Sequence, residues 1–321
     1  MIRHLNACFG LFVTLTLAGA TCVTAQERNP TTGAPRVGSR EAEELFSQQC
    51  AECHSDEQSG RTPTRFSLNS MTPRAIVTAL ADGVMRSEGS DLSGEQRVAL
   101  AEYLTDRTYS DELVGPSAFC ADAGPARLDL ERVHWMGYGA DLAGTGYQPA
   151  THAGLAAATV PELELRWAFG FPGSSQVRTK PTFVGDVVLV GDQFGGVYAL
   201  EAETGCVRWI FEAESGIRGG IPVAEDSTGR TIAYLVDYRT TAYALDTESG
   251  EVLWKTRVGW HPESNNTGHA TIYDGKLIVP ISTMGEVVVA MSPTYECCTS
   301  SGAVAALDLE SGELEWYPRV I

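Results

Sequence analysis

A unit of two strands that ends in tryptophan occurs three times in the second half of the chain, and it limits the folds open to this half. Each copy joins two short apolar runs through an acidic turn that contains Thr-Gly or Ser-Gly. The copies cover residues 197–209, 242–254 and 304–316. Repeats of about 40 to 45 residues with such strands are typical of the blades of a β-propeller. The glycine permits the tight turn, and we expect each tryptophan to pack between neighbouring sheets.

The patterning around these tryptophans supports the same fold. Trp209 and Trp254 are 45 residues apart, whereas Trp316 follows after 62 because of an insertion, and Trp167 ends an earlier partial copy. From Val133 onward, helix signals vanish and turns alternate with apolar runs that we expect to be buried strands. These runs are 187–190, 233–236 and 276–279. The roughly 190 residues after Val133 suffice for about four blades.

A Cys-x-x-Cys-His sequence at Cys50, Cys53 and His54 indicates a different chemistry in the first half. It is the attachment sequence of a c-type haem. Two thiols three positions apart lie on one side of a helical turn, so each can form a thioether to a haem vinyl group. His54 then offers its imidazole to the iron as the proximal ligand. The alternatives are a chance match and a zinc half-site, but no second Cys/His pair has zinc-finger spacing.

Three short helices are expected around this haem. From Ser39 the pattern is helical and runs into the haem cysteines. Thr72-Pro73 marks a second helix start, with proline at the first helical position. Ser93 and Gln96 form a capping box that opens a third helix. So few residues cannot bury a large core, and covalent haem supplies the missing apolar mass. This is the architecture of a small cytochrome c.

The iron needs a sixth ligand, and Met71 and Met85 are the candidates. Met85 lies in a loop between two predicted helices, about 30 residues beyond His54, which suits a distal ligand. Met71 stands just before a helix start and could equally be core packing. We therefore predict Met85. A sulfur ligand would raise the haem potential and suit an electron acceptor.

The beginning of the chain is typical of a secretory signal. A short polar start is followed by a mostly apolar stretch and by Val23-Thr24-Ala25, a small-residue cleavage pattern. We expect a periplasmic or secreted protein; an uncleaved anchor is the alternative. No other apolar run is long enough for a membrane span, so no integral span is expected after signal removal. The formal net charge of −18 argues against nucleic acid and anionic membranes as partners.

Six cysteines remain outside the signal, and two of them take haem. The other four are Cys120, Cys206, Cys297 and Cys298. In an oxidising compartment they should pair. The adjacent Cys297 and Cys298 could close on each other, which would leave Cys120 with Cys206, but sequence alone allows three pairings.

The repeats resemble the tryptophan motifs of the quinoprotein dehydrogenases, which bind pyrroloquinoline quinone (PQQ). The segment 134–139, with Asp141 and Gln148, resembles the entry to their propeller. From about residue 40 to 321 the layout is similar to the polyvinyl alcohol dehydrogenase cytochrome group, whose members join an N-terminal cytochrome c to an eight-bladed PQQ propeller. The resemblance implies that this chain, with about four blades of a probable eight, is truncated.

The expected fold class is thus α plus all-β, a small all-α cytochrome c domain followed by a β-propeller. The expected organisation is a signal peptide at 1–25, a flexible lead at 26–39, a cytochrome c domain at 40–107, a linker at 108–132 and the N-terminal part of a PQQ-type propeller at 133–321.

The segment 295–299, which holds Cys297 and Cys298, is the most specific part of the resemblance. In related alcohol dehydrogenases a vicinal disulfide lies over the PQQ plane. Two departures affect the cofactor site. Ser300-Ser301-Gly302 stands where the family usually has Arg-Gly, so an arginine contact to the quinone is absent. Gly144-Thr145-Gly146 replaces the commoner Asn-Thr-Arg.

The resemblance implies a periplasmic quinohaemoprotein dehydrogenase. PQQ would oxidise an alcohol with Ca²⁺ polarising the quinone, and electrons would pass singly to haem c and on to a soluble cytochrome or terminal oxidase. Cys297 and Cys298 would stack on PQQ, and Arg218 would pair with a PQQ carboxylate. Asp237 and His261 are weaker candidates. Arg218 as a plain surface charge and His261 as a loop-shaping residue are the alternatives.

Some assignments cannot be made from this chain. The catalytic base and most calcium ligands cannot be placed, so we expect a dehydrogenase that is inactive as this fragment. The competing hypothesis is an electron-transfer cytochrome c fused to a quinone-free propeller scaffold. The Cys297-Cys298 pair favours the enzyme, and the missing arginine favours the scaffold.

Overall fold

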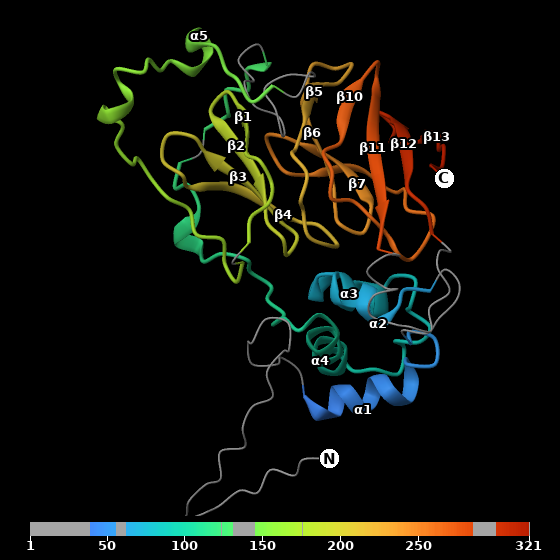
Figure 1. The fold of residues 1–321 in the computed structure, drawn as a ribbon. Coiled ribbons are helices and arrows are strands. Elements are labelled where there is room, and N and C mark those ends of the chain that lie inside the picture. Colours follow the sequence, from blue (N-terminus) through green and yellow to red (C-terminus); the bar gives the residue numbers. More distant parts are fainter. Residues whose placement is uncertain are drawn as a thin grey trace, which may run out of the picture. The chain divides into compact units, whose positions relative to one another are not determined.

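A helical domain precedes three β-sheets in the chain (Figure 1). The computed structural model describes residues 39–55, 62–122, 124–130, 145–174, 176–284 and 300–320. The predicted signal peptide, the lead up to residue 38, the segment 134–144 and the pair Cys297-Cys298 lie outside these ranges. Nowhere in the described ranges is a helix both long enough and apolar enough to cross a membrane.

Side-chain caps start each helix of the helical domain. The helices are α1 (Arg40–Gln49), α2 (Arg65–Asn69), α3 (Pro73–Ala81) and α4 (Gly94–Thr105). Their N-caps are Ser39, Thr64, Thr72 and Ser93, each of which accepts a hydrogen bond from a backbone N–H of the first turn. The predicted starts of α1, α3 and α4 are confirmed, including the capping box of Ser93 and Gln96. The sequence did not indicate α2, because five residues are too few to show a periodic stripe.

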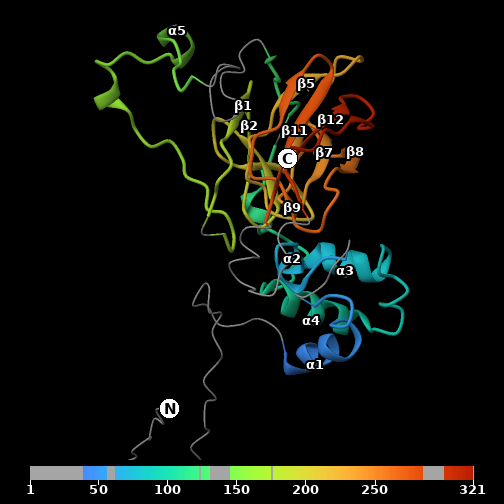
Figure 2. The ribbon, with the colours of Figure 1, turned by 45° about the vertical axis from the view of Figure 1, so that its right-hand side comes forward.

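Helix α4 lies between α1 and α3 (Figure 2). Leu100 and Ala101 of α4 are almost fully buried, and they belong to one core with Phe46 of α1 and Ile76 of α3. Cys50 packs against the edge of the same core. The haem motif is thus attached directly to the small apolar core of this domain.

All three sheets are antiparallel; two have four strands and the third has five, and apart from β9 in the third the strands follow chain order within each sheet. The first sheet holds β1 (Thr182–Val184), β2 (Val187–Gly191), β3 (Gly196–Glu201) and β4 (Val207–Glu212). The second holds β5 (Val223–Glu225), β6 (Thr231–Val236), β7 (Thr241–Asp246) and β8 (Val252–Arg257). The third holds β10 (Thr271–Tyr273), β11 (Lys276–Thr283), β12 (Ala303–Asp308) and β13 (Leu314–Trp316). The short β9 (Ser264–Asn265) pairs with the end of β11.

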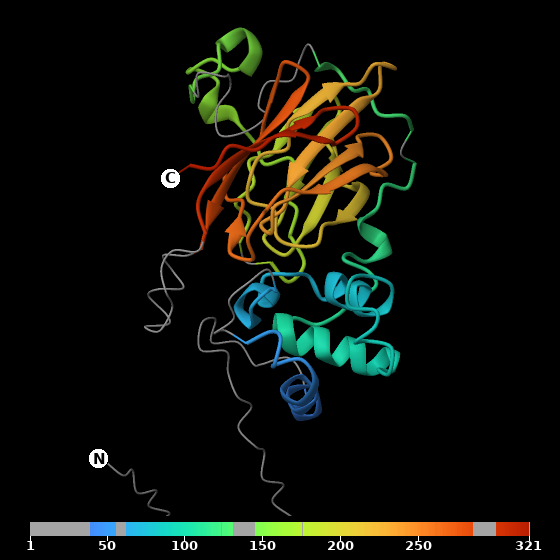
Figure 3. The same ribbon diagram turned by 90° about the vertical axis from the view of Figure 1, so that its right-hand side faces the viewer.

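Neighbouring sheets pack face to face (Figure 3), and the alternation of side chains in the middle sheet shows why. In β7, Tyr243 and Leu245 join the core shared with the first sheet, whereas Ala242 and Ala244 join the core shared with the third. Successive strand residues point to opposite faces, so a strand that is apolar at every position is buried on both. The predicted strands at 187–190, 233–236 and 276–279 are confirmed as parts of β2, β6 and β11; the first two are fully buried, whereas buried and half-buried residues alternate in the third.

The repeat tryptophans connect each sheet to the next. The indole Nε1 of Trp209 donates to the carbonyl oxygen of Thr247 at 2.9 Å, and that of Trp254 donates to Leu309 at 3.1 Å. Trp167 makes the equivalent bond to Ala202 at 3.0 Å. In every case the acceptor lies in the acidic turn of the following repeat. This confirms the prediction that the tryptophans pack between sheets.

The glycine of each acidic turn lies under the tryptophan of the preceding repeat. A Cβ atom on Gly250 would lie 2.7 Å from Cδ2 of Trp209, and one on Gly312 would lie 2.5 Å from Cδ2 of Trp254. Both glycines also have positive φ, +77° and +70°. The turn therefore needs glycine for two independent reasons, its backbone conformation and the approach of the indole.

The described residues contain three complete sheets, and the blade number predicted from the sequence is not decided by them. The segment with Trp167 has no assigned strand, although Trp167, Phe169 and Phe171 pack against the first sheet. The expectation that helix signals vanish after residue 133 is wrong for two short elements, α5 (Ala150–Ala153) and the 3₁₀ turn Val160–Glu162. Elements of three or four residues leave no periodic pattern in a sequence.

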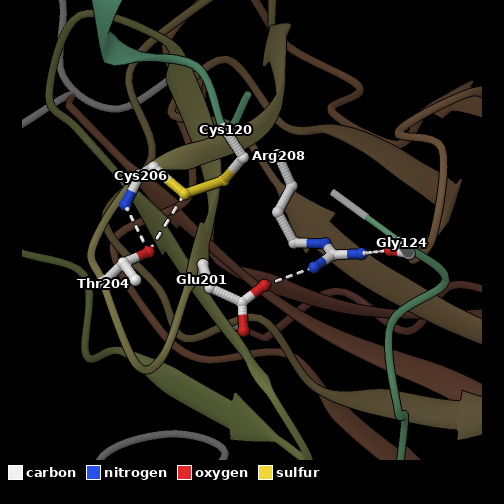
Figure 4. The surroundings of a disulfide bond; sticks show 6 residues. All are labelled: Cys120, Gly124, Glu201, Thr204, Cys206 and Arg208. Carbon is white, nitrogen blue, oxygen red and sulfur yellow. Dashed lines mark hydrogen bonds and ion pairs between the residues drawn. A yellow bond between two sulfur atoms is a disulfide. The ribbon is translucent and has the colours of Figure 1, made fainter. Parts of the chain in front are cut away.

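A disulfide ties the predicted linker to the first sheet (Figure 4). Cys120 pairs with Cys206, which is one of the pairings left open by the sequence. The backbone N–H of Cys120 also donates to the carbonyl of Val207 at 2.9 Å. Beside the bridge, the Arg208 guanidinium bonds both the Glu201 carboxylate and the Gly124 carbonyl. These contacts therefore hold the linker against the β3–β4 turn.

Gly250→Ala should destabilise the protein more than Gly275→Ala. Both positions have positive φ, but a Cβ atom at Gly275 meets nothing within 4 Å. Backbone strain should cost about 1 kcal/mol at either site, and the clash with Trp209 should add about 1–3 kcal/mol at Gly250 only. Urea unfolding of the two variants measures the difference. Equal losses of unfolding free energy would contradict the proposed contact with the indole.

Replacing both cysteines, Cys120→Ser with Cys206→Ser, should lower the free energy of unfolding by about 2–4 kcal/mol, because the bridge closes a long loop. The sequence separation of the two cysteines is 86 residues. Chemical denaturation measures the loss. Peptide mapping without reduction is the control, and recovery of the two cysteine peptides as separate species would contradict the bridge.

Candidate haem and quinone sites

The haem motif continues the last turn of α1. Cys50 is the C-cap of this helix, and its carbonyl accepts hydrogen bonds from the backbone N–H of Cys53 at 3.1 Å and of His54 at 3.0 Å. Both thiols are free, Cys50 half-buried and Cys53 exposed. Burial and the neighbouring Cys53 raise the pKa of the Cys50 thiol. Two free thiols on one helical turn at the edge of an apolar core fit covalent haem c.

His54 is oriented by a backbone carbonyl. Its side chain is only 7% exposed, and its Nδ1 lies 2.7 Å from the carbonyl oxygen of Pro63. Since a carbonyl only accepts, Nδ1 must carry the proton, which leaves the lone pair on Nε2. This is the tautomer that a proximal iron ligand requires, with its other nitrogen held by a partner that increases its basicity. The arrangement of His54 therefore also fits haem.

Both candidate distal ligands are partly buried against the same core as Cys50. Met71 forms an antiparallel bridge with Ser215, in the loop after β4. Met85 lies in the loop after α3, where its N–H donates to the carbonyl of Ala79 at 3.0 Å. The backbone position of Met71 is thus explained by packing on the sheets. We retain Met85 as the predicted ligand.

The helical domain is docked on the loop that follows β4. The N–H of Thr72 donates to the carbonyl of Glu214 at 2.8 Å, and the Ser215 hydroxyl donates to the carbonyl of Ser70. Arg74 of α3 pairs with Glu212 through a bond of 2.6 Å. These contacts place the haem-motif domain against the ends of the sheets from which the β4–β5 loop emerges.

Charged and aromatic side chains gather at these sheet ends around Tyr238. The guanidinium of Arg218 stacks on the Tyr238 ring, 4.3 Å from its centroid. Burial raises the pKa of Tyr238, and the charges of Arg218 and Arg239 oppose this while that of Glu263 adds to it. We call Arg218, Tyr238, Arg239 and Glu263 the Tyr238 cluster. Arg239 and Glu263 are each only 3% exposed.

A run of buried polar residues, 263–266, borders the Tyr238 cluster. The N–H of Asn266 donates to the carbonyl of Tyr238 at 3.0 Å, and its side-chain amide donates to that of Pro280 at 2.8 Å. Three buried atoms in this region have no hydrogen-bond partner among the described residues: Nη2 of Arg239, Nδ2 of Asn265 and Oδ1 of Asn266. Buried polar groups in folded proteins are nearly always satisfied. These atoms therefore fit a polar ligand or ordered water.

Arg218 is thus brought into a polar cluster, whereas the weaker candidate Asp237 has a structural role in its repeat. Asp237 is fully buried, and its carboxylate accepts from the N–H of Thr241 at 2.9 Å and from the hydroxyl of Tyr243 at 3.1 Å. Burial raises its pKa to about 6. Asp192 makes the same bond to Tyr198 one repeat earlier, at 3.0 Å. The repetition of this bond shows that the carboxylate belongs to the fold of each repeat.

His261, the other weaker candidate, shapes a turn. Its Nδ1 accepts from the N–H of Glu263 at 3.1 Å, and its carbonyl accepts from that of Ser264 at 3.0 Å. Burial, and then the charge of Arg239, lower its pKa. Sequence reasoning singled out His261 but missed Glu263 and Asn265 immediately after it. The signal available was the uninterrupted polar run 263–266.

The positions of Cys297 and Cys298 cannot be compared with the Tyr238 cluster, since they lie outside the described residues. Their segment leaves β11 near Thr283 and returns at Ser300, and the hydroxyls of these two residues are hydrogen-bonded. Thr283 pairs in turn with Ser264 of β9. In the described ranges no three His, Cys, Asp or Glu side chains converge as a metal site.

Two protein-family models match the chain. The model described as "Outer membrane protein assembly factor BamB" (PQQ_2) covers residues 154–320, which include all three sheets. The model described as "Cytochrome C oxidase, cbb3-type, subunit III" covers residues 39–104, which is the helical domain. These matches confirm the predicted fold class, a cytochrome domain followed by propeller-type repeats.

Three dehydrogenases are similar to the chain in sequence. A polyvinylalcohol dehydrogenase from Pseudomonas sp is 36% identical over 290 residues, 85% of this chain and 44% of that protein. A second, from Sphingopyxis sp. (strain 113P3), is 34% identical over 315 residues, 91% and 47%. The quinohemoprotein alcohol dehydrogenase of Comamonas testosteroni is 25% identical over 227 residues, 63% and 30%. The chain spans about half the length of the first two relatives. The resemblance stated from the sequence is confirmed.

Met85→Ala should abolish the weak near-infrared sulfur-to-iron band of the oxidised haem protein, because it removes the predicted distal sulfur. Met71→Ala is the matched control and should retain the band, since Met71 is held by its contact with Ser215. Absorption spectra of both variants, with haem attached, decide between them. Loss of the band in Met71→Ala alone would contradict the assignment.

Proposed function

The chain belongs to the PQQ_2 repeat family, and we propose from this premise that it is part of a haem-linked quinoprotein dehydrogenase that oxidises an alcohol. Two observations support the proposal. A domain with free Cys50 and Cys53 and an oriented His54 is docked on the sheets. The sheet ends that it meets carry the buried charges of the Tyr238 cluster.

Haem c would be held by thioethers to Cys50 and Cys53 and by His54, with Met85 on the distal side. It would carry one electron at a time, which suits transfer to a soluble cytochrome or a terminal oxidase. The protein's own contribution is the orientation of His54 by the Pro63 carbonyl and the apolar core around Phe46. The apolar core excludes water from one side of the motif, and the carbonyl fixes the orientation of the ligand nitrogen.

PQQ, when bound, would supply the two-electron acceptor for the alcohol carbon. Arg218 is suited to pair with one of its carboxylates, because its guanidinium is already positioned over the Tyr238 ring. The single observation that carries this role is the gathering of arginines at the sheet ends around Tyr238, beside buried polar atoms that lack partners in the described part of the chain. Calcium, proposed with the quinone, would need ligands beyond the Tyr238 cluster.

The disulfide pattern supports a further part of the proposal. With Cys50 and Cys53 committed to haem and Cys120 bridged to Cys206, the cysteines of this sequence that remain outside the predicted signal are Cys297 and Cys298, and we propose that they pair with each other. A vicinal disulfide would be flat and rigid enough to stack on a planar quinone. Disulfides and haem attachment both belong to oxidising compartments outside the cytoplasm. We therefore propose export to the periplasm.

The test is direct binding of PQQ to the haem-loaded protein in the presence of Ca²⁺. Equilibrium dialysis should show binding, and Arg218→Met should weaken it about tenfold or more, because a charged hydrogen bond is lost. Arg230→Met is the matched control. Its guanidinium pairs with Asp226 in an exposed turn, so binding should not change. Adding an alcohol to the PQQ-loaded protein should then reduce the haem, as seen in its ferrous absorption bands.

Two outcomes would contradict the proposal. Absence of PQQ binding would favour the electron-transfer cytochrome fused to a quinone-free scaffold. Equal weakening in Arg218→Met and Arg230→Met would show that binding follows total charge and not the Tyr238 cluster. Comparing a small primary alcohol, a secondary alcohol and polyvinyl alcohol in the haem-reduction assay would identify the substrate class.

A further inference from the structure

A buried polar network joins the helical domain to the Tyr238 cluster. The hydroxyls of Thr64 and Ser67, in the first turn of α2, each lie 3.5 Å from Oε1 of Glu263. Nη1 of Arg239 donates to the Ser67 hydroxyl at 3.3 Å. All four side chains are at least nine-tenths buried. The two domains thus share one buried carboxylate and one buried guanidinium.

The same turn of α2 holds the proximal histidine. Thr64 follows Pro63 directly, and the Pro63 carbonyl accepts the Nδ1 proton of His54 at 2.7 Å. The Thr64 hydroxyl also caps α2 by accepting from the N–H of Ser67 at 3.1 Å. A displacement of Thr64 would therefore move the carbonyl that orients the imidazole. Only one peptide unit separates the carbonyl acceptor from the contact with Glu263.

We propose that Glu263 and Arg239 of the propeller part are positioning residues for the haem, which set its reduction potential through Thr64, Pro63 and His54. The inference rests on the proposed function in one respect only, that the Cys-x-x-Cys-His motif carries haem. It does not require PQQ, an alcohol or turnover. It assigns to the propeller a second role beside holding a quinone: it tunes the electron acceptor that is docked on it.

Electrostatics give the two residues opposite effects. A charge acts strongly at a buried site, because little water screens it. The negative charge of Glu263 stabilises the oxidised haem, which carries one more positive charge than the reduced form, and so lowers the potential. The positive charge of Arg239 does the reverse. The two opposite charges also offset each other at this site, so removing either one increases the effect of the other.

Domain docking alone does not account for this network. The bonds that join Ser70, Thr72 and Arg74 to the end of β4 and the loop after it already hold the helical domain in place. Burying two charged side chains is a costly way to add stability, because each of them loses its hydration. Buried charges beside a redox centre instead have a direct effect on its potential. Glu263 and Arg239 contact Thr64 and Ser67, next to the carbonyl that orients His54, and these contacts link the two charges to the haem ligand.

The experiment measures the haem midpoint potential by spectroelectrochemical titration of the haem-loaded chain, without PQQ. Glu263→Gln should shift the potential to more positive values, and Arg239→Gln should shift it to more negative values. The double variant should lie between the two single variants, near wild type. Glu251→Gln is the matched control for charge, because Glu251 is exposed in the β7–β8 turn, and it should leave the potential unchanged.

A second series tests the path through α2. Thr64→Val removes the hydroxyl but keeps the shape, and it should shift the potential to more positive values as the Pro63 carbonyl loosens. Thr64→Ser keeps the hydroxyl and should restore the wild-type value. Unfolding of the helical domain would move the potential of every variant in one direction, whereas the proposal requires opposite signs for Glu263→Gln and Arg239→Gln.

Several outcomes would overturn the proposal. These are unchanged potentials in both single variants, shifts of the same sign, or an equal shift in Glu251→Gln. If a charge variant does not load haem, the Thr64 pair decides alone, and equal potentials in Thr64→Val and Thr64→Ser would refute the path. Potential shifts of the expected signs in a protein that does not bind PQQ would contradict the proposed dehydrogenase and would still support this inference.

Discussion

The structure depends on the contact between the tryptophan of one repeat and the acidic turn of the next. The indole ring of Trp209 covers Gly250 and bonds the carbonyl of Thr247, so a single side chain fixes both the separation and the register of two sheets. Trp254 and Gly312 repeat the arrangement between the second and third sheets. Because only glycine permits this approach, the contact fixes the position of each sheet relative to its neighbour.

Regular stacking of the sheets has a consequence at their ends. The loops after β4, between β6 and β7, and before β9 are brought together there, although each belongs to a different sheet. The repeat uses buried carboxylates of its own, Asp192 and Asp237, each bonded by a tyrosine of the strand that follows. Arg239 lies in the turn that Asp237 closes, whereas Arg218 and Glu263 come from the loops after β4 and before β9. The helical domain docks on the same end of the sheets.

Much of this could be predicted from local patterns. The capping residues Ser39, Thr72 and Ser93, the buried strands and the role of the repeat tryptophans all follow from neighbours within a few residues, and the structure agrees with them. Helix α2 could not be predicted, because its five residues carry no periodicity. The same holds for α5. Asp237 was a candidate ligand in sequence terms, since a sequence does not show that a tyrosine and an N–H occupy both of its oxygens.

The sequence by itself determined the chemistry of the chain: a haem motif whose five residues suffice for attachment, and repeats whose spacing suffices for propeller-type sheets. Both are properties of short segments, so no long-range contact is needed to recognise them. Only the tertiary structure decided that Cys120 pairs with Cys206 and that Thr64 meets Glu263, 199 residues later. The physical reason is that such contacts arise from the packing of whole domains, and nothing in the local pattern of either residue records its partner.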